Sequence, residues 1–259
     1  MIKTFLSTTK QLRYRWHHFT YTNFADISSV SELKNQYKNK PMLVIGNGPS
    51  LNQTPLDEFI DVGSIGMNKI DLLFDRVKWR PTLILCANGL VVQQHWRTLS
   101  KSEIPVFLSW ECRWIVSRRY RKCFKYFLSL ANTEFSRDIC EYTGSAGTIT
   151  YKALQFAYFM GADPVILFGV DHSFNFQGNP NEYAKRQGKD VNHFDPNYFK
   201  EGQYWGLPNL QLSELAYKQA KMAFEEDGRN IYDATINGKL NIFPKISVVE
   251  AKGYCGLSR

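Results

Sequence analysis

The feature that most limits how this chain can fold is a buried-strand pattern that runs directly into a glycine-rich turn. Residues 42–45 are all apolar, and Gly46-Asn47-Gly48-Pro49-Ser50 follows at once. Glycine lets a backbone approach a ligand closely, Asn offers an amide donor and acceptor, and Ser can cap a following helix whose free N–H groups favour phosphate. The turn matches neither a P-loop nor a GxGxxG fingerprint, so it indicates either a nucleotide site or an ordinary strand-to-helix connection.

A second pattern of the same kind lies later in the chain. Ser145, Gly147 and Thr148 precede a helical pattern, and this helix leads to an apolar strand, 165–168, that runs into Gly169-Val170-Asp171. Small residues that open a helix, followed by a strand that ends in a carboxylate, are typical of a corner that faces a ligand. The two corners together favour a binding site.

Three successive predicted strands are followed by an asparagine. These residues are Asn47, Asn68 and Asn88. Ligands of an open parallel sheet sit beyond the carboxyl ends of the strands, so the three amides are expected to converge on one crevice. Asn is also a common turn residue, which explains each position singly, but the coincidence of three favours a site.

The remaining patterns predict one α/β domain, Rossmann-like, with a mainly parallel sheet flanked by helices. With 259 residues, 44% of them hydrophobic, the chain can bury one sizeable core. We expect a basic, aromatic N-terminal segment over residues 1–38 and a single domain over 39–259. Residues 175–208 lack helical periodicity, and such a long irregular stretch is more often a binding loop or lid than filler. Further strands are expected over 105–109 and 230–235, with helices over 29–37, 113–127 and 212–226.

Taken together, these motifs resemble the bacterial lipooligosaccharide sialyltransferases and the wider set of hydroxymethylpterin pyrophosphokinase-like Rossmann proteins of surface-polysaccharide pathways. The resemblance spans roughly residues 41–246. It implies that the asparagines at the strand ends hold a cytidine monophosphate (CMP) sugar, that Asp171 accepts hydrogen bonds from the ribose, and that Tyr183 contacts the donor phosphate. With the residues of both corners, the predicted donor site comprises Gly46, Asn47, Gly48, Pro49, Ser50, Asn68, Asn88, Ser145, Gly147, Thr148, Asp171 and Tyr183.

The chain departs from this family at two positions. A second family tyrosine is Ser173 here, and the catalytic histidine of the family matches Leu207, which cannot take a proton. Another group must then deprotonate the acceptor, and a histidine is best suited because its pKa lies near the working pH. His193 leads because it lies in the predicted lid with Asp195 nearby, and His172 is the second candidate. Either histidine could equally bond a loop carbonyl.

The sequence does not favour a bound metal or another cofactor. Asp171, His172, His193 and Asp195 match no strong ligand spacing, and the chain contains no Asp-x-Asp. A pyrophosphokinase would need ATP and magnesium to neutralise the transferring phosphates. A CMP sugar carries only one phosphate, so the nucleotide sugar is expected as a substrate of a metal-independent reaction.

Charge points to anionic partners. The net charge is +8, and basic residues concentrate in Lys3 to Arg15 and in Arg113 to Lys125, the second interleaved with aromatic residues. A helix of that kind suits an anionic membrane surface or an anionic acceptor, whereas the simpler interpretation is a solvated face. No recognition motif supports nucleic acid as a partner. We expect a cytoplasmic protein, and the basic stretch leaves open a peripheral position at the inner face of the membrane.

The preferred hypothesis is a glycosyltransferase that moves a sugar, most plausibly a CMP-activated acidic sugar, to a cell-surface glycan or glycolipid acceptor. Two alternatives of other classes remain open. A pterin-type pyrophosphokinase would use ATP and magnesium. A non-catalytic scaffold for polysaccharide assembly would keep the fold without a base.

Overall fold

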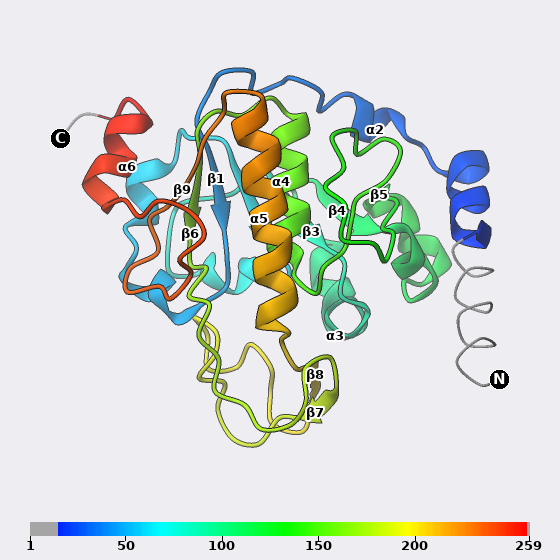
Figure 1. The fold of residues 1–259 in the computed structure, drawn as a ribbon. Coiled ribbons are helices and arrows are strands. Elements are labelled where there is room, and N and C mark those ends of the chain that lie inside the picture. The colour runs from blue at the N-terminus through cyan, green and yellow to red at the C-terminus, as the bar shows by residue number, and fades with distance from the viewer. Residues whose placement is uncertain (1–14, 258–259) are drawn as a thin grey trace.

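A parallel sheet forms the centre of the computed structural model, which describes residues 15–257 (Figure 1). Its seven strands lie in the order β5-β4-β3-β2-β1-β6-β9, and every neighbouring pair is parallel. They are β1 (Met42–Ile45), β2 (Ser64–Met67), β3 (Leu83–Cys86), β4 (Val106–Ser109), β5 (Lys125–Phe127), β6 (Val165–Phe168) and β9 (Ile231–Asp233). The predicted α/β, Rossmann-like class is confirmed.

The strand order reverses between β1 and β6. From β1 the chain adds β2 to β5 on one side, and it then crosses back to place β6 and β9 on the other. Val44 pairs with Leu167 across this boundary. A reversal of this kind opens a crevice at the carboxyl ends of the two strands, where ligands of open α/β sheets bind.

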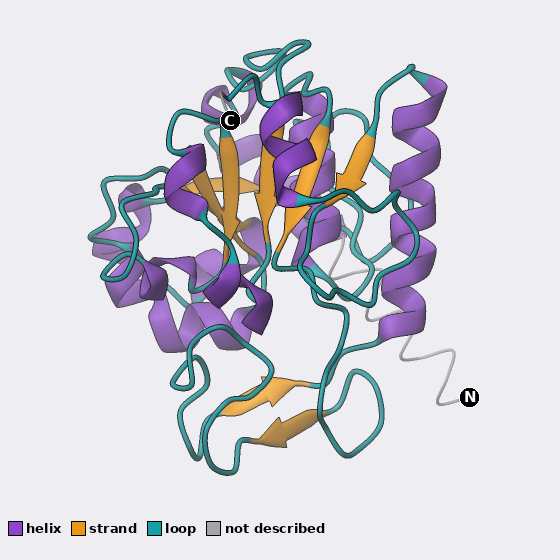
Figure 2. Ribbon diagram, turned by 90° about the vertical axis from the view of Figure 1, so that its left-hand side faces the viewer, coloured by secondary structure: helices purple, strands orange, loops and turns teal. Residues whose placement is uncertain are grey.

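Helices cover both faces of the sheet (Figure 2), and an apolar cluster of buried side chains fills the space on each face. Side chains alternate along a strand, so Met42 and Val44 of β1 pack on one face and Leu43 and Ile45 on the other. The first face is covered by α4 (Ile149–Phe159) and α5 (Leu210–Glu226), which pack against each other. The second is covered by α3 (Gly89–Leu99), α6 (Val248–Tyr254) and the short 3-10 helices η1 (Pro49–Gln53), η2 (Leu56–Phe59), η3 (Ile70–Leu73) and η4 (Trp110–Trp114).

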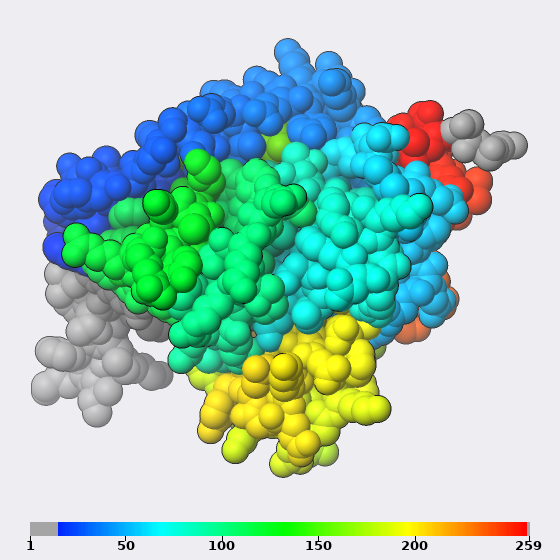
Figure 3. Space-filling model, turned by 180° about the vertical axis from the view of Figure 1, so that it is seen from behind, coloured from blue at the N-terminus to red at the C-terminus, as the bar shows by residue number. Residues whose placement is uncertain are grey.

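A long irregular segment, residues 172–208, leaves the carboxyl end of β6 and returns at the start of α5. It contains one antiparallel pair, β7 (Tyr183–Lys185) and β8 (Tyr204–Gly206), which stands apart from the main sheet (Figure 2). Viewed from behind, this yellow segment packs beneath the cyan-to-teal surface (Figure 3). One contact of that interface is a hydrogen bond of 2.9 Å from Gln94 Nε2 of α3 to the carbonyl of Tyr204. We call residues 172–208 the lid segment.

Two predicted helices are wrong. The helix expected over 29–37 is only α2 (Ser28–Ser31), and hydrogen-bonded turns continue from it. The helix expected over 113–127 is replaced by η4, by η5 (Arg118–Cys123) and by the edge strand β5. The cause is tertiary, because Lys125 to Phe127 pair with β4 and the Arg113 side chain is buried between the rings of Trp110 and Trp114.

The predicted basic stretch from Lys3 lies, apart from Arg15, outside the described residues. Among residues 15–257, no helix has the length and apolar character needed to cross a membrane.

Candidate functional site

A cavity of about 520 Å³ opens at the carboxyl ends of the central strands. Its walls come from the turns after β1, β2, β3 and β6, from the first turns of α4 and α5, and from the lid segment. The predicted residues that line it are Gly46, Asn47, Gly48, Asn68, Asn88, Ser145, Gly147, Thr148, Asp171, His172, Tyr183 and His193. The structure thus brings together most of the side chains expected at the site, although they come from segments far apart in the sequence.

Three predicted residues do not line the cavity: Pro49, Ser50 and Asp195. Pro49 opens η1, and the Ser50 side chain does not cap that helix. Ser50 instead donates from its N–H and its hydroxyl to Oδ1 and Oδ2 of Asp171, at 3.0 and 2.7 Å. These two bonds tie the turn after β1 to the end of β6 across the crevice.

Glycine is required where these two strand ends meet. A Cβ at Gly46 would lie 2.1 Å from the carbonyl oxygen of Gly169, and one at Gly48 would lie 1.8 Å from Oδ2 of Asp171. Burial raises the pKa of Asp171, while the hydrogen bonds from Ser50 act in the opposite direction. Asp171, which the resemblance predicts to contact a ribose, therefore has a structural role in the protein itself, since it holds the first corner in place.

The side-chain oxygens of Asn47 and Asn68 are buried and accept no hydrogen bond from any described residue. Asn68 has a φ of +55°, a left-handed conformation that Asn adopts more readily than most residues. A buried acceptor left without a donor costs about 1–3 kcal/mol, and such groups in native structures call for an explanation. Both residues line the cavity, so a ligand with N–H or O–H groups would satisfy them.

Two other predicted residues cap helices. Asn88 Oδ1 accepts from the N–H groups of Leu90 and Val91 at the start of α3, and Thr148 Oγ1 accepts from the N–H of Thr150 at the start of α4. The cap commits the oxygen of Asn88 and leaves only its amide N–H groups for a ligand. The first turns of α4 and α5 both line the cavity, and helix N-termini favour anions.

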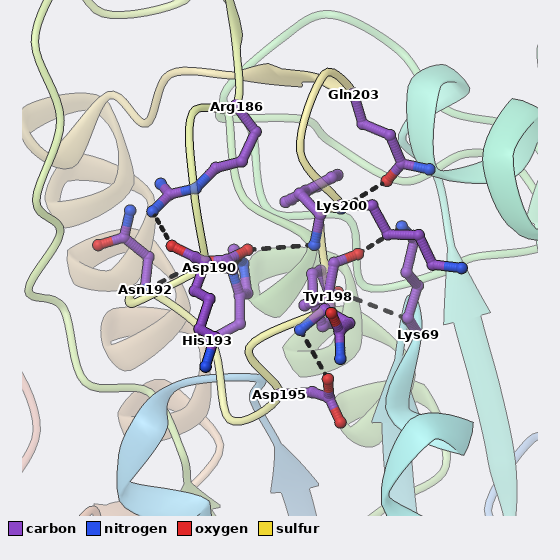
Figure 4. A network of polar contacts seen from close by, with 12 residues as sticks. Lys69, Arg186, Asp190, Asn192, His193, Asp195, Tyr198, Lys200 and Gln203 are labelled. Atoms are coloured by element: carbon purple, nitrogen blue, oxygen red, sulfur yellow. Dashed lines mark hydrogen bonds and ion pairs between the residues drawn. The ribbon is translucent and has the colours of Figure 1, made fainter.

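His193 is held by a buried carboxylate, and the partner is Asp190, not the expected Asp195 (Figure 4). Its Nδ1 lies 2.9 Å from Oδ2 of Asp190, and its ring stacks on Tyr198 with centroids 4.0 Å apart. Burial would raise the pKa of Asp190, but His193, the N–H of Asn192 and the charge of Arg186 together outweigh it and lower the pKa. Asp195 turns away, because it accepts from the N–H of Asn197 and lies 3.6 Å from Arg76.

His172 has a different partner, which lies on α5. Its Nε2 lies 3.0 Å from Oε1 of Glu214 on α5, and its ring meets Tyr217 edge-on. The backbone of His172 has a φ of +52°, an uncommon conformation for a residue with a side chain. The cavity is therefore lined by two histidines, each oriented by a carboxylate.

Sequence reasoning missed two buried lysines near the site. Lys152 of α4 lines the cavity and donates to Ser129 Oγ at 2.7 Å and to the carbonyl of Gly144 at 3.0 Å. Lys69 follows β2 and donates to the carbonyl of Tyr198 at 2.6 Å. Burial lowers the pKa of each to about 8. In the sequence Lys152 is the one charged residue of the helix over 149–159, and that is the signal that could have revealed it.

No group of three or more His, Cys, Asp or Glu side chains within residues 15–257 is arranged to hold a metal ion. The four residues considered for a mixed site have separate partners. Asp171 is bound to Ser50, His172 to Glu214, His193 to Asp190, and Asp195 to Arg76 and Asn197.

Comparison with known proteins gives structural matches only: no family model and no curated protein sequence matches this chain. The MAf glycosyltransferase from Magnetospirillum magneticum AMB-1 matches 86% of the chain with a TM-score of 0.51 and 15% identity. The chain spans 38% of that longer protein. At this level of identity, the match shows a common fold.

Two structures of the sialyltransferase CstII from Campylobacter jejuni also match, both with a TM-score of 0.44. One is a complex with the substrate analogue cytidine-5′-monophosphate, with 14% identity over 81% of this chain and 86% of that one. The other is a complex with CMP-3FNeuAc, with 12% identity over 80% of this chain and 86% of that one.

Proposed function

We propose that this protein is a glycosyltransferase that moves the sugar of a nucleotide sugar, a CMP-activated acidic sugar, to a hydroxyl of a surface glycan or glycolipid. The observation that carries the proposal is that Asn47 and Asn68, which line the cavity at the strand-order reversal, each have a buried side-chain oxygen that accepts no hydrogen bond from a described residue. The fold shared with the MAf glycosyltransferase and the motif resemblance to sialyltransferases support the same class.

The chemistry of the two asparagines suits a nucleoside. Their oxygens need donors, and a cytosine amino group and ribose hydroxyls provide them. The cavity volume of about 520 Å³ lies in the range of small-molecule sites, roughly 300–1,000 Å³. The donor phosphate would then lie by the first turns of α4 and α5, where helix N-termini favour anions without a metal.

His193 is the proposed general base. With Nδ1 directed to Asp190, its Nε2 is the nitrogen left to take the proton from the acceptor hydroxyl. As the proton moves to Nε2, the acceptor oxygen bonds to the anomeric carbon, the bond from that carbon to the phosphate oxygen breaks, and the nucleoside monophosphate leaves. Asp190 acts as a positioning residue, since its buried carboxylate fixes the ring and stabilises the imidazolium.

Nucleotide binding tests the donor site. We expect thermal-shift and calorimetric titration to show preference for cytidine nucleotides over uridine, guanosine and adenosine nucleotides, with no requirement for magnesium. Asn47→Ala and Asn68→Ala should each weaken binding about 10- to 100-fold, the effect of losing a buried hydrogen bond. Asn241→Ala, at an exposed position outside the cavity, is the matched control and should bind like the parent. Affinity only for ATP with magnesium would favour the pyrophosphokinase instead.

Turnover tests the base. His193→Gln should reduce transfer by roughly 10²–10⁴-fold while donor affinity stays the same, and Asp190→Asn should lower turnover in the same way. His172→Gln is the comparison, because its partner is Glu214. If His193→Gln keeps parental turnover and His172→Gln loses it, His172 is the base. Donor binding without transfer to any glycan acceptor would favour the scaffold.

A further inference from the structure

A second cavity, of about 400 Å³, lies between the C-terminal half of α3 and the turn η5. Three cationic side chains line it, Arg97, Lys101 and Arg119, with two aromatic rings, Trp96 and Tyr120, and two serines. Its lining shares no residue with the cavity at the strand ends. The proposed reaction leaves this cavity unexplained.

Charge in the second cavity is uncompensated. No acidic residue is part of its lining, and within residues 15–257 none of the three cations forms an ion pair. Arg97 lies in the last turn of α3, and Lys101 lies two residues beyond its end, where cations complement the helix dipole. That reason does not apply to Arg119, which belongs to η5 and is brought to the same cavity by the fold.

The aromatic rings hold the guanidinium groups in place. Arg97 lies over the ring of Trp96, with 4.6 Å to the centroid, and Arg119 lies over Tyr120 at 4.8 Å. The two rings contact each other with centroids 5.4 Å apart. A guanidinium stacked on a ring keeps the N–H groups at its edge free for a planar anion, and it loses less side-chain entropy on binding.

From this arrangement we infer that the second cavity binds the anionic part, a carboxylate or phosphate, of a carbohydrate. A saccharide can enter a concave site and place its C–H face near Tyr120 while its acid group meets the cations. The three cations are exposed, but the surface that they line is concave, a shape that suits a saccharide and not the flat face of a bilayer. The ligand class is therefore an anionic oligosaccharide and not a lipid surface.

The inference rests on the proposed function in one respect, because the anionic oligosaccharide would be part of the acceptor. Helix α3 links the two cavities: Gly89 and Val91 at its start line the first, and Arg97 near its end lines the second. Eight residues of helix span about 12 Å. An acceptor that places its terminal sugar in the first cavity would reach the second with an acidic sugar further along its chain.

Calorimetric titration with a defined acidic tetrasaccharide, oligogalacturonate, tests the inference directly. The parent should bind it, bind maltotetraose (neutral, same length) at least 10-fold more weakly, and lose affinity as salt rises. The triple variant Arg97→Gln/Lys101→Gln/Arg119→Gln should lose at least 10-fold in affinity. A control that removes the same charge from exposed positions elsewhere, Lys38→Gln/Lys40→Gln/Lys218→Gln, should bind like the parent.

The inference is wrong if the parent binds the acidic and the neutral saccharide equally, or if the triple variant keeps parental affinity. It is also wrong if the triple variant and the control lose affinity equally, or if the protein binds phosphatidylglycerol vesicles and does not bind the saccharide. Titration with inorganic phosphate separates a simple anion site from a saccharide site, and phosphate binding as tight as saccharide binding would also refute it. Cytidine nucleotide binding, measured on the same samples, shows whether the donor-site proposal stands or fails separately.

Discussion

Lys152 gives the sharpest quantitative prediction, because a buried ammonium group lies in the wall of the site. Its side chain is 3% exposed, and burial lowers its pKa to about 8 from an ordinary value near 10.4. The difference between these two pKa values corresponds to about 3 kcal/mol of free energy. Lys152→Met removes the charge and keeps most of the side-chain volume.

The sign follows from proton counting. Below pH 8 the amine is protonated in both the folded and unfolded states, so its titration does not change stability. Between pH 8 and about 10.4 the folded protein releases the proton while the unfolded chain keeps it, and stability rises with pH. The free energy of unfolding of the parent minus that of Lys152→Met should therefore increase by up to about 3 kcal/mol from pH 7 to pH 10.5.

Denaturant unfolding of both proteins at pH 7, 8, 9 and 10.5 measures this difference. Other groups titrate in the same window. Burial raises the pKa of Cys255, which does not interact with Lys152, to about 11, so this thiol makes the protein less stable as pH rises above about 8.5. Such contributions are common to both proteins and cancel in the difference. Lys218→Met, at an exposed position, is the control and should differ from the parent by a constant amount. A Lys152→Met difference that is also constant with pH would refute the argument.

Other substitutions test the site and its surroundings. Gly48→Ala should abolish nucleotide binding, because the added Cβ would lie 1.8 Å from Oδ2 of Asp171; calorimetry that finds parental affinity would show that this corner can move. Asn88→Ala should lower the free energy of unfolding by about 1 kcal/mol through loss of the α3 cap, and unchanged stability in urea would contradict that role. Lys69→Met should speed proteolysis within the lid segment, since it removes the bond to the Tyr198 carbonyl, whereas Lys78→Met should not. Arg118→Ala/Lys122→Ala tests the expected contact with an anionic membrane: each cation near such a surface is worth about 1 kcal/mol, so sedimentation with phosphatidylglycerol vesicles should fall at least 10-fold, and equal sedimentation would leave only a solvated face.

The ends of the central strands could be predicted, because the residues that mark them lie next to one another in the sequence. Each central strand is a short apolar run closed by Gly, Asn or Asp, and the rule that ligands meet the carboxyl ends of parallel strands then brings Asn47, Asn68 and Asp171 together. The glycines at 46 and 48 also predicted that the backbone of this turn lies close to a neighbouring segment, and in the structure that segment contains Gly169 and Asp171. What the sequence could not provide was the division of roles, since Ser50 is bonded to Asp171 and Asn88 caps α3.

The contacts within the lid segment were not predictable, because residues in an irregular segment do not repeat along a helix or strand. Their spacing in the sequence therefore does not tell which side chains meet. Asp195 lies two residues from His193 and turns toward Arg76, whereas Asp190 lies three residues before it and accepts its hydrogen bond. The helix expected over 113–127 failed for a related reason. Its alternation of basic and aromatic residues fits an amphipathic helix, but pairing of β5 with β4 leaves room only for 3-10 turns.

The placement of His193 ties the proposed base to the proposed nucleotide site. The next residue, Phe194, donates its N–H to the carbonyl of Asn47 at 2.9 Å and accepts from Asn52 at 3.0 Å. Tyr198, whose ring stacks on His193, is bonded through its carbonyl to Lys69 at the end of β2. The base therefore reaches its position only while the lid segment contacts the turn after β1 and the end of β2. Asn47 and Asn68 belong to these same strand ends, so the lid contacts that hold the proposed base are made next to the residues proposed to bind the donor.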